Sequence, residues 1–468
     1  MQMEHVDGTL SHCNGHVSAG DSDDGSTAAD RIELTGPQTP SSGRTTEATC
    51  GDRCRTSGYA ADQQRRKLVL HFDVRNTILV SDSATHDSVE QALNSFLAGV
   101  TWGRHEPSGW VWYSDRPSLR APCPDVITYY KSRERQLVRS PADRVLLRRV
   151  TGDFTRQPIG RKFRRYFEAH LRLLEWNVVH SSASICSDIG GDEISPAVTS
   201  SAPNEPTTGT KPEMVSVDRK LTIVGANGRL YHYLLPSFVK MLYDLHADGS
   251  RFSLILRTYG VDAPRVLDSI AHVVAGNHPL FPGQLPVIVN RRPGRIRRQH
   301  GGRIRCELPP STDGTDAATV VLDTDADIYR YMSHVDGICG FVDDFRFWQE
   351  NDYTHSDGKP LWIDFADPDV QHIFFDDNIR VADAEGIVDV RLFDDADRAA
   401  TSGSGCELAA ARSLSIEEIA PLDSVCLVQA DLLECTSNVD YFINMVRLCR
   451  QNYSDYLQRH QNNHDRDV

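Results

Sequence analysis

Short apolar runs that end in polar residues, and that alternate with amphipathic helical patterns, most strongly constrain how this chain folds. A run of four to eight apolar residues is typical of a strand buried on both faces, as in a parallel sheet. Strands that alternate with helices predict an α/β fold, with a parallel sheet and helices on both of its faces. The runs that carry this prediction are 67–72, 252–256, 320–322, 373–375 and 425–429.

Apolar residues at helical spacing lie between these runs. The first pattern has Asp87 as the predicted N-cap and Glu90 three residues later, which is the spacing of a capping box. A later pattern is capped by Asp262 and stops at Gly276. The helices predicted in this way cover 87–100, 162–176, 230–247, 263–275 and 438–458.

Three segments contain too few apolar residues to offset the entropy of ordering, and we expect them to be disordered or long loops. They cover residues 1–66, 183–217 and 394–405. The rest, roughly 350 residues, is enough for one large core. We expect this core to span 67–460, with a largely helical insertion at 83–182.

Charge and hydropathy exclude several classes of protein. The chain has 50 basic and 65 acidic residues, a net charge of −15, which does not favour nucleic acid as a partner. The one exception is 291–305, with seven arginines; we favour a flexible solvated loop over an RNA-binding arm, because no aromatic residue is present to stack on a base. No apolar run reaches 18 residues and no secretory signal opens the chain, so we expect no membrane partner and a soluble, cytoplasmic protein.

Reactive residues follow three of the predicted strands. Asp73 follows the first strand, Arg257 and Thr258 end the second, and Asp376 and Asp377 end a third. Ligands of open α/β sheets bind beyond the carboxyl ends of the strands, so we expect these side chains to share one edge.

Together these residues resemble the haloacid dehalogenase-like superfamily of phosphatases and phosphotransferases. The family's first motif is an apolar strand followed by D-x-D-x-T or D-x-D-x-V, and residues 73–77 read DVRNT. The second motif, a strand ending in Thr or Ser, is matched by Thr258. The third, a lone lysine, is matched by Lys359 before Pro360, and the fourth, an acidic pair after a strand, by 376–377. The four motifs stand in the family's order, and the resemblance implies a Rossmann-like core with a cap over the strand ends.

The resemblance also implies a mechanism. Asp73 is expected to be the nucleophile on a small phosphorylated ligand, with Thr258 and Lys359 binding the phosphate. Mg²⁺ is the expected cofactor, because carboxylate and carbonyl oxygens suit it. Its expected ligands are Asp73, the backbone carbonyl of Arg75, and Asp376 or Asp377.

Arg75 departs from the family pattern, because phosphatases of this type have a general acid–base aspartate there. A guanidinium stays protonated and cannot replace it. Three interpretations remain open: activation from elsewhere with slower hydrolysis, chemistry that does not need this acid, or phosphate binding by Arg75 without turnover. Arg257, beside Thr258, is a second cation that favours phosphate binding.

Individual assignments also have alternatives. Thr258 is alternatively a capping residue and Lys359 a surface lysine, while 343–344 and 394–395 are rival acidic pairs. Three functions follow: an Mg²⁺-dependent phosphohydrolase or phosphotransferase, a catalytically inactive phospho-ligand-binding or regulatory protein, and, least favoured, an RNA-associated protein that uses 291–305.

Overall fold

The computed structural model describes residues 66–81, 87–176, 218–310, 319–381, 386–393 and 410–464. The chain divides into two units, Met1–Cys54 and Arg55–Val468, and every described residue belongs to the second. The predictions of disorder for 1–65, for 183–217 and for 394–405 fall outside the described residues.

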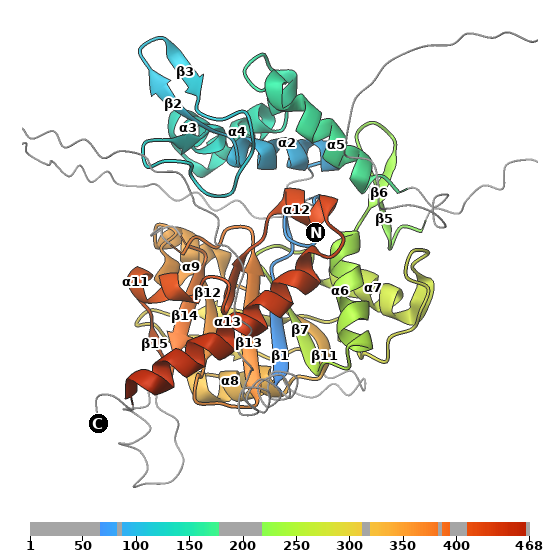
Figure 1. The fold of residues 1–468 in the computed structure, drawn as a ribbon, viewed down its shortest axis with the longest axis vertical. Helices are drawn as coiled ribbons and strands as arrows, with labels where there is room; N and C mark the ends of the chain where they lie inside the picture. The colour runs from blue at the N-terminus through green and yellow to red at the C-terminus, as the bar shows by residue number, and fades with distance from the viewer. Residues whose placement is uncertain are drawn as a thin grey trace, which may run out of the picture. The chain divides into compact units, whose positions relative to one another are not determined.

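A large, mostly parallel sheet lies at the centre of the second unit (Figure 1). Five neighbouring strands run parallel, and β8 (Gly294–Arg298) continues the parallel set beside β11 (Gly337–Val342). Strands β9 (Ile304–Glu307) and β10 (Val321–Leu322) are antiparallel at one edge. This arrangement confirms the predicted mixed α/β class with a mostly parallel sheet. In order, the five are β11 (Gly337–Val342), β7 (Phe252–Thr258), β1 (Lys67–Phe72), β13 (Val370–Asp376) and β16 (Leu427–Gln429).

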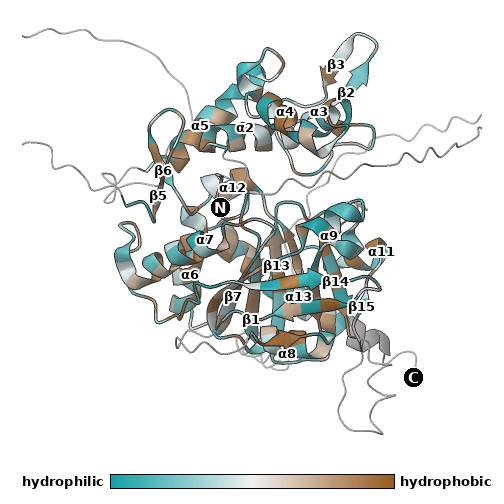
Figure 2. Cartoon of the chain, turned by 180° about the vertical axis from the view of Figure 1, so that it is seen from behind, coloured by the Kyte–Doolittle hydropathy of each residue, from teal (hydrophilic) through white to brown (hydrophobic). Residues whose placement is uncertain are grey.

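Strand β1 is buried on both faces, which explains its continuous apolar sequence. Leu68, Leu70 and Phe72 point into one hydrophobic cluster with residues of α6 (Pro236–Ala247), α7 (Ala263–His272) and α13 (Tyr441–His464). Val69 points into another cluster with residues of α8 (Asp325–His334). Figure 2 shows hydrophobic colour on the central strands, and the helices thus bury both faces of the sheet.

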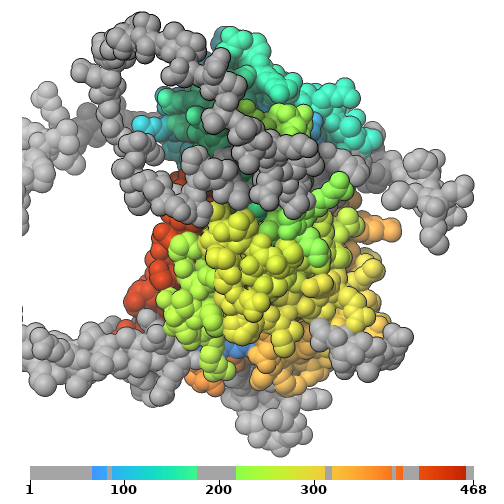
Figure 3. Space-filling model, turned by 90° about the vertical axis from the view of Figure 1, so that its right-hand side faces the viewer, coloured from blue at the N-terminus to red at the C-terminus, as the bar shows by residue number. Residues whose placement is uncertain are grey.

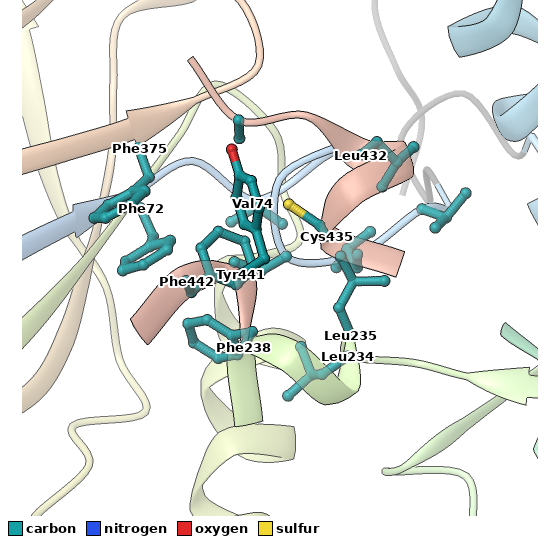
Figure 4. Close-up of a cluster of buried hydrophobic side chains, with 14 of the residues drawn as sticks. Phe72, Val74, Leu234, Leu235, Phe238, Phe375, Leu432, Cys435, Tyr441 and Phe442 are labelled. Atoms are coloured by element: carbon teal, nitrogen blue, oxygen red, sulfur yellow. The ribbon is translucent and has the colours of Figure 1, made fainter. Parts of the chain in front are cut away.

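The strand ends are anchored by aromatic packing (Figure 4). The rings of Phe72 and Phe375 stack with centroids 4.4 Å apart and an interplanar angle of 3°. Phe442 meets both rings edge-on, at 5.4 and 5.8 Å. Asp73 follows Phe72, and Asp376 follows Phe375, so this packing fixes the positions from which both acids leave the sheet.

The helix predicted at 230–247 is shorter than expected. Leu230–His232 forms β6, which pairs antiparallel with β5 (Thr222–Val224), and α6 begins only at Pro236. Proline lacks a backbone N–H and therefore suits the first turn of a helix. Figure 3 shows the green-to-yellow residues of this region and of α7 closely packed at the surface on this side.

A second sheet consists of β12 (Lys359–Ile363), β14 (Val388–Leu392) and β15 (Arg412–Ser413). Trp362 on β12 packs with Val69 of the central sheet, while Leu361 and Ile363 pack with Phe374. The short helices α9 (Phe345–Glu350) and α11 (Ile416–Ile419) complete this part of the chain, whereas α12 (Leu432–Ser437) packs with α6 and α13 on the central sheet. The small sheet thereby brings the start of β12 to the central strands.

Residues 87–176, here called the insertion segment, contain helices and a small antiparallel sheet. Helix α2 (Val89–Gly99) is capped by Ser88, with Gln91 completing the capping box, so the prediction of Asp87 as the cap was wrong by one residue. The elements of the insertion segment are α2 (Val89–Gly99), β2 (Trp102–Glu106), β3 (Gly109–Trp112), β4 (Ile127–Thr128), α3 (Tyr129–Leu137), α4 (Arg144–Thr151) and α5 (Arg164–Leu174).

Among all the described residues of the chain, each helix is too short or too polar to cross a membrane.

The arginine-rich run 291–305 is not the flexible loop that we predicted. Its residues form much of the β8–β9 hairpin, in which Ile296 pairs with Cys306. Arg298 is buried, and its Nη2 donates to Asp389 Oδ2 at 2.6 Å and to the Gly358 carbonyl at 2.6 Å. The run therefore joins the central sheet to the second sheet.

Candidate functional site

Asp73 lies at the carboxyl end of β1, where the parallel strands β7 and β13 flank it. Its backbone N–H donates to the Phe375 carbonyl at 2.8 Å, which continues the ladder one residue past the strand. The residue is 8% exposed. The predicted nucleophile is therefore buried but reaches the edge of the sheet where ligands bind in this class of fold.

Lys359, the first residue of β12, contacts two of the predicted acids. Its Nζ lies 2.5 Å from Asp73 Oδ1 and 2.8 Å from Asp376 Oδ2. It also donates to the Arg257 carbonyl at 3.2 Å. The side chain is fully buried, so it is a structural part of the site and not the surface lysine of the alternative interpretation.

Asp73, Asp376 and Asp377, here called the acid cluster, meet at one point. Each offers a carboxylate oxygen, and these atoms lie within 4.8 Å of one another. Octahedral Mg²⁺ binds oxygens at about 2.1 Å, so opposite ligands lie about 4.2 Å apart. The acid cluster therefore has the donor type and approximately the spacing that a divalent ion needs.

The loop after β1 is tied to the acid cluster by side chains. Asn76 Nδ2 donates to Asp377 Oδ2 at 3.2 Å, and the Thr77 hydroxyl accepts from the Asp377 N–H at 3.2 Å. Asn76 has a φ of 56°, a left-handed conformation that asparagine tolerates better than most residues. Its Oδ1 is buried without a hydrogen-bond partner within the described residues.

Burial and the neighbouring charges shift the pKa values of the acid cluster and of Lys359. Burial, together with Asp376, raises the pKa of Asp73 to about 7 against the opposing effect of Lys359. Burial, Asp376 and Asp73 raise the pKa of Asp377 well above its ordinary value. Burial lowers the pKa of Lys359, but Asp376 and Asp73 outweigh it and the pKa is raised, so the lysine stays charged.

The charges of the cluster are not balanced by protein groups alone. Three carboxylates face one ammonium, a formal excess of two negative charges in a buried place. Such an excess is costly unless protons or a cation compensate for it. The excess equals the charge of one Mg²⁺ ion, so the donor type and the formal charge of the acids, with Lys359 beside them, are compatible with a divalent metal.

Thr258 ends β7 on the same side of the sheet. It is 5% exposed, and its hydroxyl accepts a hydrogen bond from the Gly260 N–H at 2.9 Å. Within the described residues this is its only side-chain hydrogen bond, so the hydroxyl proton remains available for a phosphate oxygen. Lys359, which contacts Asp73 and Asp376, also reaches the carbonyl of the preceding residue, Arg257, so the end of β7 lies near the acid cluster.

Arg257 does not supply the second phosphate-binding cation that we predicted. Its guanidinium is fully buried and donates to both carboxylate oxygens of Asp343, at 3.0 and 2.6 Å. A third bond goes to the Pro360 carbonyl at 2.9 Å. This pairing also removes 343–344 as a rival acidic pair, because Asp343 is occupied and Asp344 caps α9.

Arg75 lies near the acid cluster, and its charge acts on Asp377. Its Nη2 lies 3.6 Å from Asp87 Oδ2, at the start of the insertion segment, and its side chain is 36% exposed. Arg75 is thus a partly exposed cation in an ion pair with Asp87.

The sequence analysis did not assign roles to Asn76 and Asn378, which both contact the acids. Asn378 donates from its backbone to Asp376 Oδ1 at 2.8 Å and from its side chain to Asp377 Oδ1 at 3.0 Å. The available signal was an asparagine close behind each acid, three residues after Asp73 and directly after Asp377, since asparagine tolerates turns and its amide donates to carboxylates.

A scan against models of known protein families, a search of curated proteins and a search of solved structures each returned no match to this chain. No relative therefore assigns a role to the acid cluster or to Lys359. Any proposal about function therefore rests on the residues of the site and their geometry.

Proposed function

We propose that this chain is a magnesium-dependent phosphohydrolase or phosphotransferase of the haloacid dehalogenase-like type, with a Rossmann-like core and Asp73 as nucleophile. The observation that carries the proposal is the convergence of Asp73, Asp376, Asp377 and Lys359 at the carboxyl ends of the parallel strands. These residues belong to the ends of three different strands, β1, β12 and β13, and a turn or cap explanation for each acid alone does not explain their meeting.

The acid cluster would hold Mg²⁺ through Asp73 and one or both of Asp376 and Asp377. The ion would neutralise negative charge on the phosphoryl group that is transferred. The 376–377 pair is oriented for this role by Asn76, Thr77 and Asn378.

Asp73 would attack phosphorus, forming a carboxylate–phosphorus bond as the bond to the ester oxygen breaks. Lys359 stays charged beside Asp73 and would stabilise the charge on the phosphoryl oxygens, with the Thr258 hydroxyl as a further donor. Water, or a second alcohol in a transferase, would then release the phosphoryl group from Asp73.

A phospho-ligand-binding protein without turnover is the second candidate, and Arg75 is the observation that favours it. The side chain cannot protonate a leaving group, and its partner Asp87 lies 3.6 Å away. If the chain is instead a phosphohydrolase, the first candidate, an arginine at this position leads to slow hydrolysis of the phosphorylated Asp73.

Turnover of an activated aryl phosphate in the presence of Mg²⁺ separates the two candidates. We expect release of phosphate by the wild type, loss on chelation, and at least a hundredfold loss in Asp73→Asn. Asp440→Asn, at an exposed ion pair with Lys240, is the matched control and should keep full activity. Activity that survives in Asp73→Asn contradicts the proposal, and phosphate binding without turnover supports the second candidate.

A further inference from the structure

The β8–β9 hairpin has one buried face and one exposed face. Its apolar side chains pack in one cluster with residues of α8; they are Ile296, Ile304 and Cys306. Successive side chains of a strand point to opposite faces, so the residues between them point outward. Those that are exposed are arginines, and Arg303, just before β9, is exposed as well. This outward side, here called the arginine face, consists of Arg295, Arg297, Arg303 and Arg305.

The pairing of the two strands brings like charges together on the arginine face. Arg297 lies directly opposite Arg305, and Arg295 lies opposite Glu307. Residues directly opposite each other have Cβ atoms about 5 Å apart, so two arginines in this position repel each other. Within the described part of the chain, none of the four arginines makes an ion pair or a side-chain hydrogen bond. The positive charge of the face is therefore not neutralised by contacts among these residues.

The hairpin holds the arginine face in a fixed register. Gly301 and Gly302 have φ angles of 84° and 77°, which glycine adopts without strain, and the Gln299 N–H donates to the Arg303 carbonyl at 2.9 Å. On the buried side, Arg298 binds the carboxylate of Asp389. A preformed row of cations loses less conformational entropy on binding than a flexible arm does. The array is thus better suited to bind an anionic partner than the loop expected from the sequence.

The residue type and the spacing indicate which anion fits. The run 291–305 contains seven arginines and no lysine. A guanidinium donates two parallel N–H bonds to phosphate oxygens, and it is less strongly hydrated than an ammonium. Outward residues of one strand recur about every 7 Å, which gives a row of cations. A nucleic acid carries one phosphate for each nucleotide and so presents a matching row of anions.

An aromatic ring for base stacking is absent from the run itself but is supplied by α9. The Arg298 N–H donates to Asp344, the cap of α9, at 3.3 Å, and the rings of His300 and Phe347 lie 6.0 Å apart. Phe345, in the first turn of α9, is 42% exposed. The bases of a single strand stack on such rings, whereas the bases of a duplex already stack on one another. Helix α9 therefore adds a stacking surface at the tip of the hairpin.

We propose that the arginine face binds single-stranded nucleic acid, with phosphates on its four arginines and a base on Phe345. The phosphate backbone is common to RNA and DNA, and contacts to it carry no sequence information, so we expect no sequence preference. Because the whole chain has a net charge of −15, we expect binding to be weak, with a dissociation constant of about 10⁻⁵ M. The inference does not depend on the proposed function of the acid cluster.

Fluorescence anisotropy of labelled oligonucleotides tests the proposal on the full chain. A uridine RNA and a thymidine DNA of about 20 nucleotides are compared with a duplex of the same length. We expect both single strands to bind, about fivefold or more tightly than the duplex. Between about 50 and 200 mM salt, four phosphate contacts predict a slope of log K against log salt near about −2.8. No binding of either single strand, or equal binding of the duplex, overturns the assignment.

Variants at exposed positions locate the binding. Arg297→Gln/Arg305→Gln should weaken binding of the RNA about tenfold and make the salt slope shallower by about 1.4. Arg219→Gln/Arg447→Gln removes the same charge from exposed positions elsewhere and should keep the affinity of the wild type. Equal weakening by the two double variants overturns the assignment, because net charge would then govern binding.

Phe345→Leu tests the stacked base separately from the phosphate contacts. The variant should weaken binding of the RNA about fivefold and leave the salt slope unchanged, because stacking involves no counterion. Circular dichroism before and after heating checks that the variant is folded. Unchanged affinity in a folded Phe345→Leu protein contradicts a base on this ring.

Competition identifies other occupants of the arginine face. Polyglutamate and vesicles of phosphatidylserine and phosphatidylcholine are added, at equal concentrations of negative charge, to the complex with labelled RNA. Unlabelled RNA should displace the label about tenfold more effectively than either. Polyglutamate that competes as well as RNA would assign the face to an acidic protein, and vesicles that do so would assign it to a membrane surface. Either result overturns the assignment.

Discussion

The ammonium of Lys359 lies 2.5 Å from Oδ1 of Asp73, although 286 residues separate them in the sequence. The contact is buried, and the same ammonium reaches Asp376 at 2.8 Å. Lys359 thus partly compensates for three acids that would otherwise repel one another, and the stability of the site depends on it.

Replacement of Lys359 by methionine should leave the acid cluster without its cation. Removing one partner of a buried ion pair leaves the charge of the other uncompensated, so we expect the free energy of unfolding to fall by about 3–5 kcal/mol. Urea denaturation at neutral pH measures this. Lys220→Met, at an exposed pair with Asp268, is the control, with an expected change below about 0.5 kcal/mol. Equal effects of the two substitutions would show that Lys359 does not hold the cluster.

Asp377→Asn should distinguish two effects on stability, the repulsion among the three carboxylates and the binding of Mg²⁺ by them. Without metal, removal of one of three neighbouring carboxylates relieves repulsion, so the variant should be at least as stable as the wild type. With Mg²⁺ at 100 times its dissociation constant, the wild type should gain about 2.7 kcal/mol, and the variant much less. Thermal unfolding with and without Mg²⁺ provides both comparisons. The same Mg²⁺-dependent gain in both proteins would exclude Asp377 as a ligand.

The two arginines at adjacent positions of β8 should differ in their importance for stability. Arg298 is buried and paired with the fully buried Asp389, whereas Arg297 is exposed. We expect Arg298→Met to lower the free energy of unfolding by about 3 kcal/mol or more, and Arg297→Met to change it by less than about 0.5 kcal/mol. Chemical denaturation of the two variants is the measurement. Destabilisation by neither substitution would support the solvated loop that we first predicted.

A buried histidine pair should make stability depend on pH. His71 Nε2 and His372 Nδ1 lie 3.0 Å apart, and His372 Nε2 contacts the Ser333 hydroxyl. Burial, and then the charge of Lys67, lowers the pKa of His372 to about 3, while burial, His372 and Arg257 lower that of His71. Because the unfolded chain binds these protons near pH 6.5 and the folded chain does not, stability is full above pH 6.5 and falls toward pH 3.

The expected slope is about 1.4 kcal/mol per pH unit for each histidine in that window. Asp73 has a raised pKa and acts in the opposite direction, so the comparison must be between the wild type and His71→Gln/His372→Gln. Denaturation between pH 7 and pH 5 should show a shallower loss of stability in the double variant. Parallel curves would indicate that the pair is already protonated in the folded protein.

The sequence predicted the parallel strands β1, β7, β13 and β16 and the acids that follow β1 and end β13, because strands buried on both faces must be apolar throughout. It missed the parallel strand β11, whose apolar run GICGFV contains two glycines, and the run predicted at 320–322 forms the antiparallel edge strand β10. It did not predict the partners of Arg257 and Arg298. Asp343 and Asp389 lie 86 and 91 residues from these arginines, and nothing local in the sequence distinguishes a buried arginine from a solvated one. The hairpin of 294–307 was missed for this reason, since its alternating arginines read as a polar loop.

The identity of the phosphorylated residue tests the central claim most directly. Wild-type protein is mixed with Mg²⁺ and an aryl phosphate, quenched in acid, reduced with borohydride and digested, because reduction converts an aspartyl phosphate to homoserine. Peptide mass spectrometry should then find homoserine at position 73, and no such product in Asp73→Asn. Turnover without modification at position 73, or modification at another aspartate, would contradict the role of Asp73 as the nucleophile.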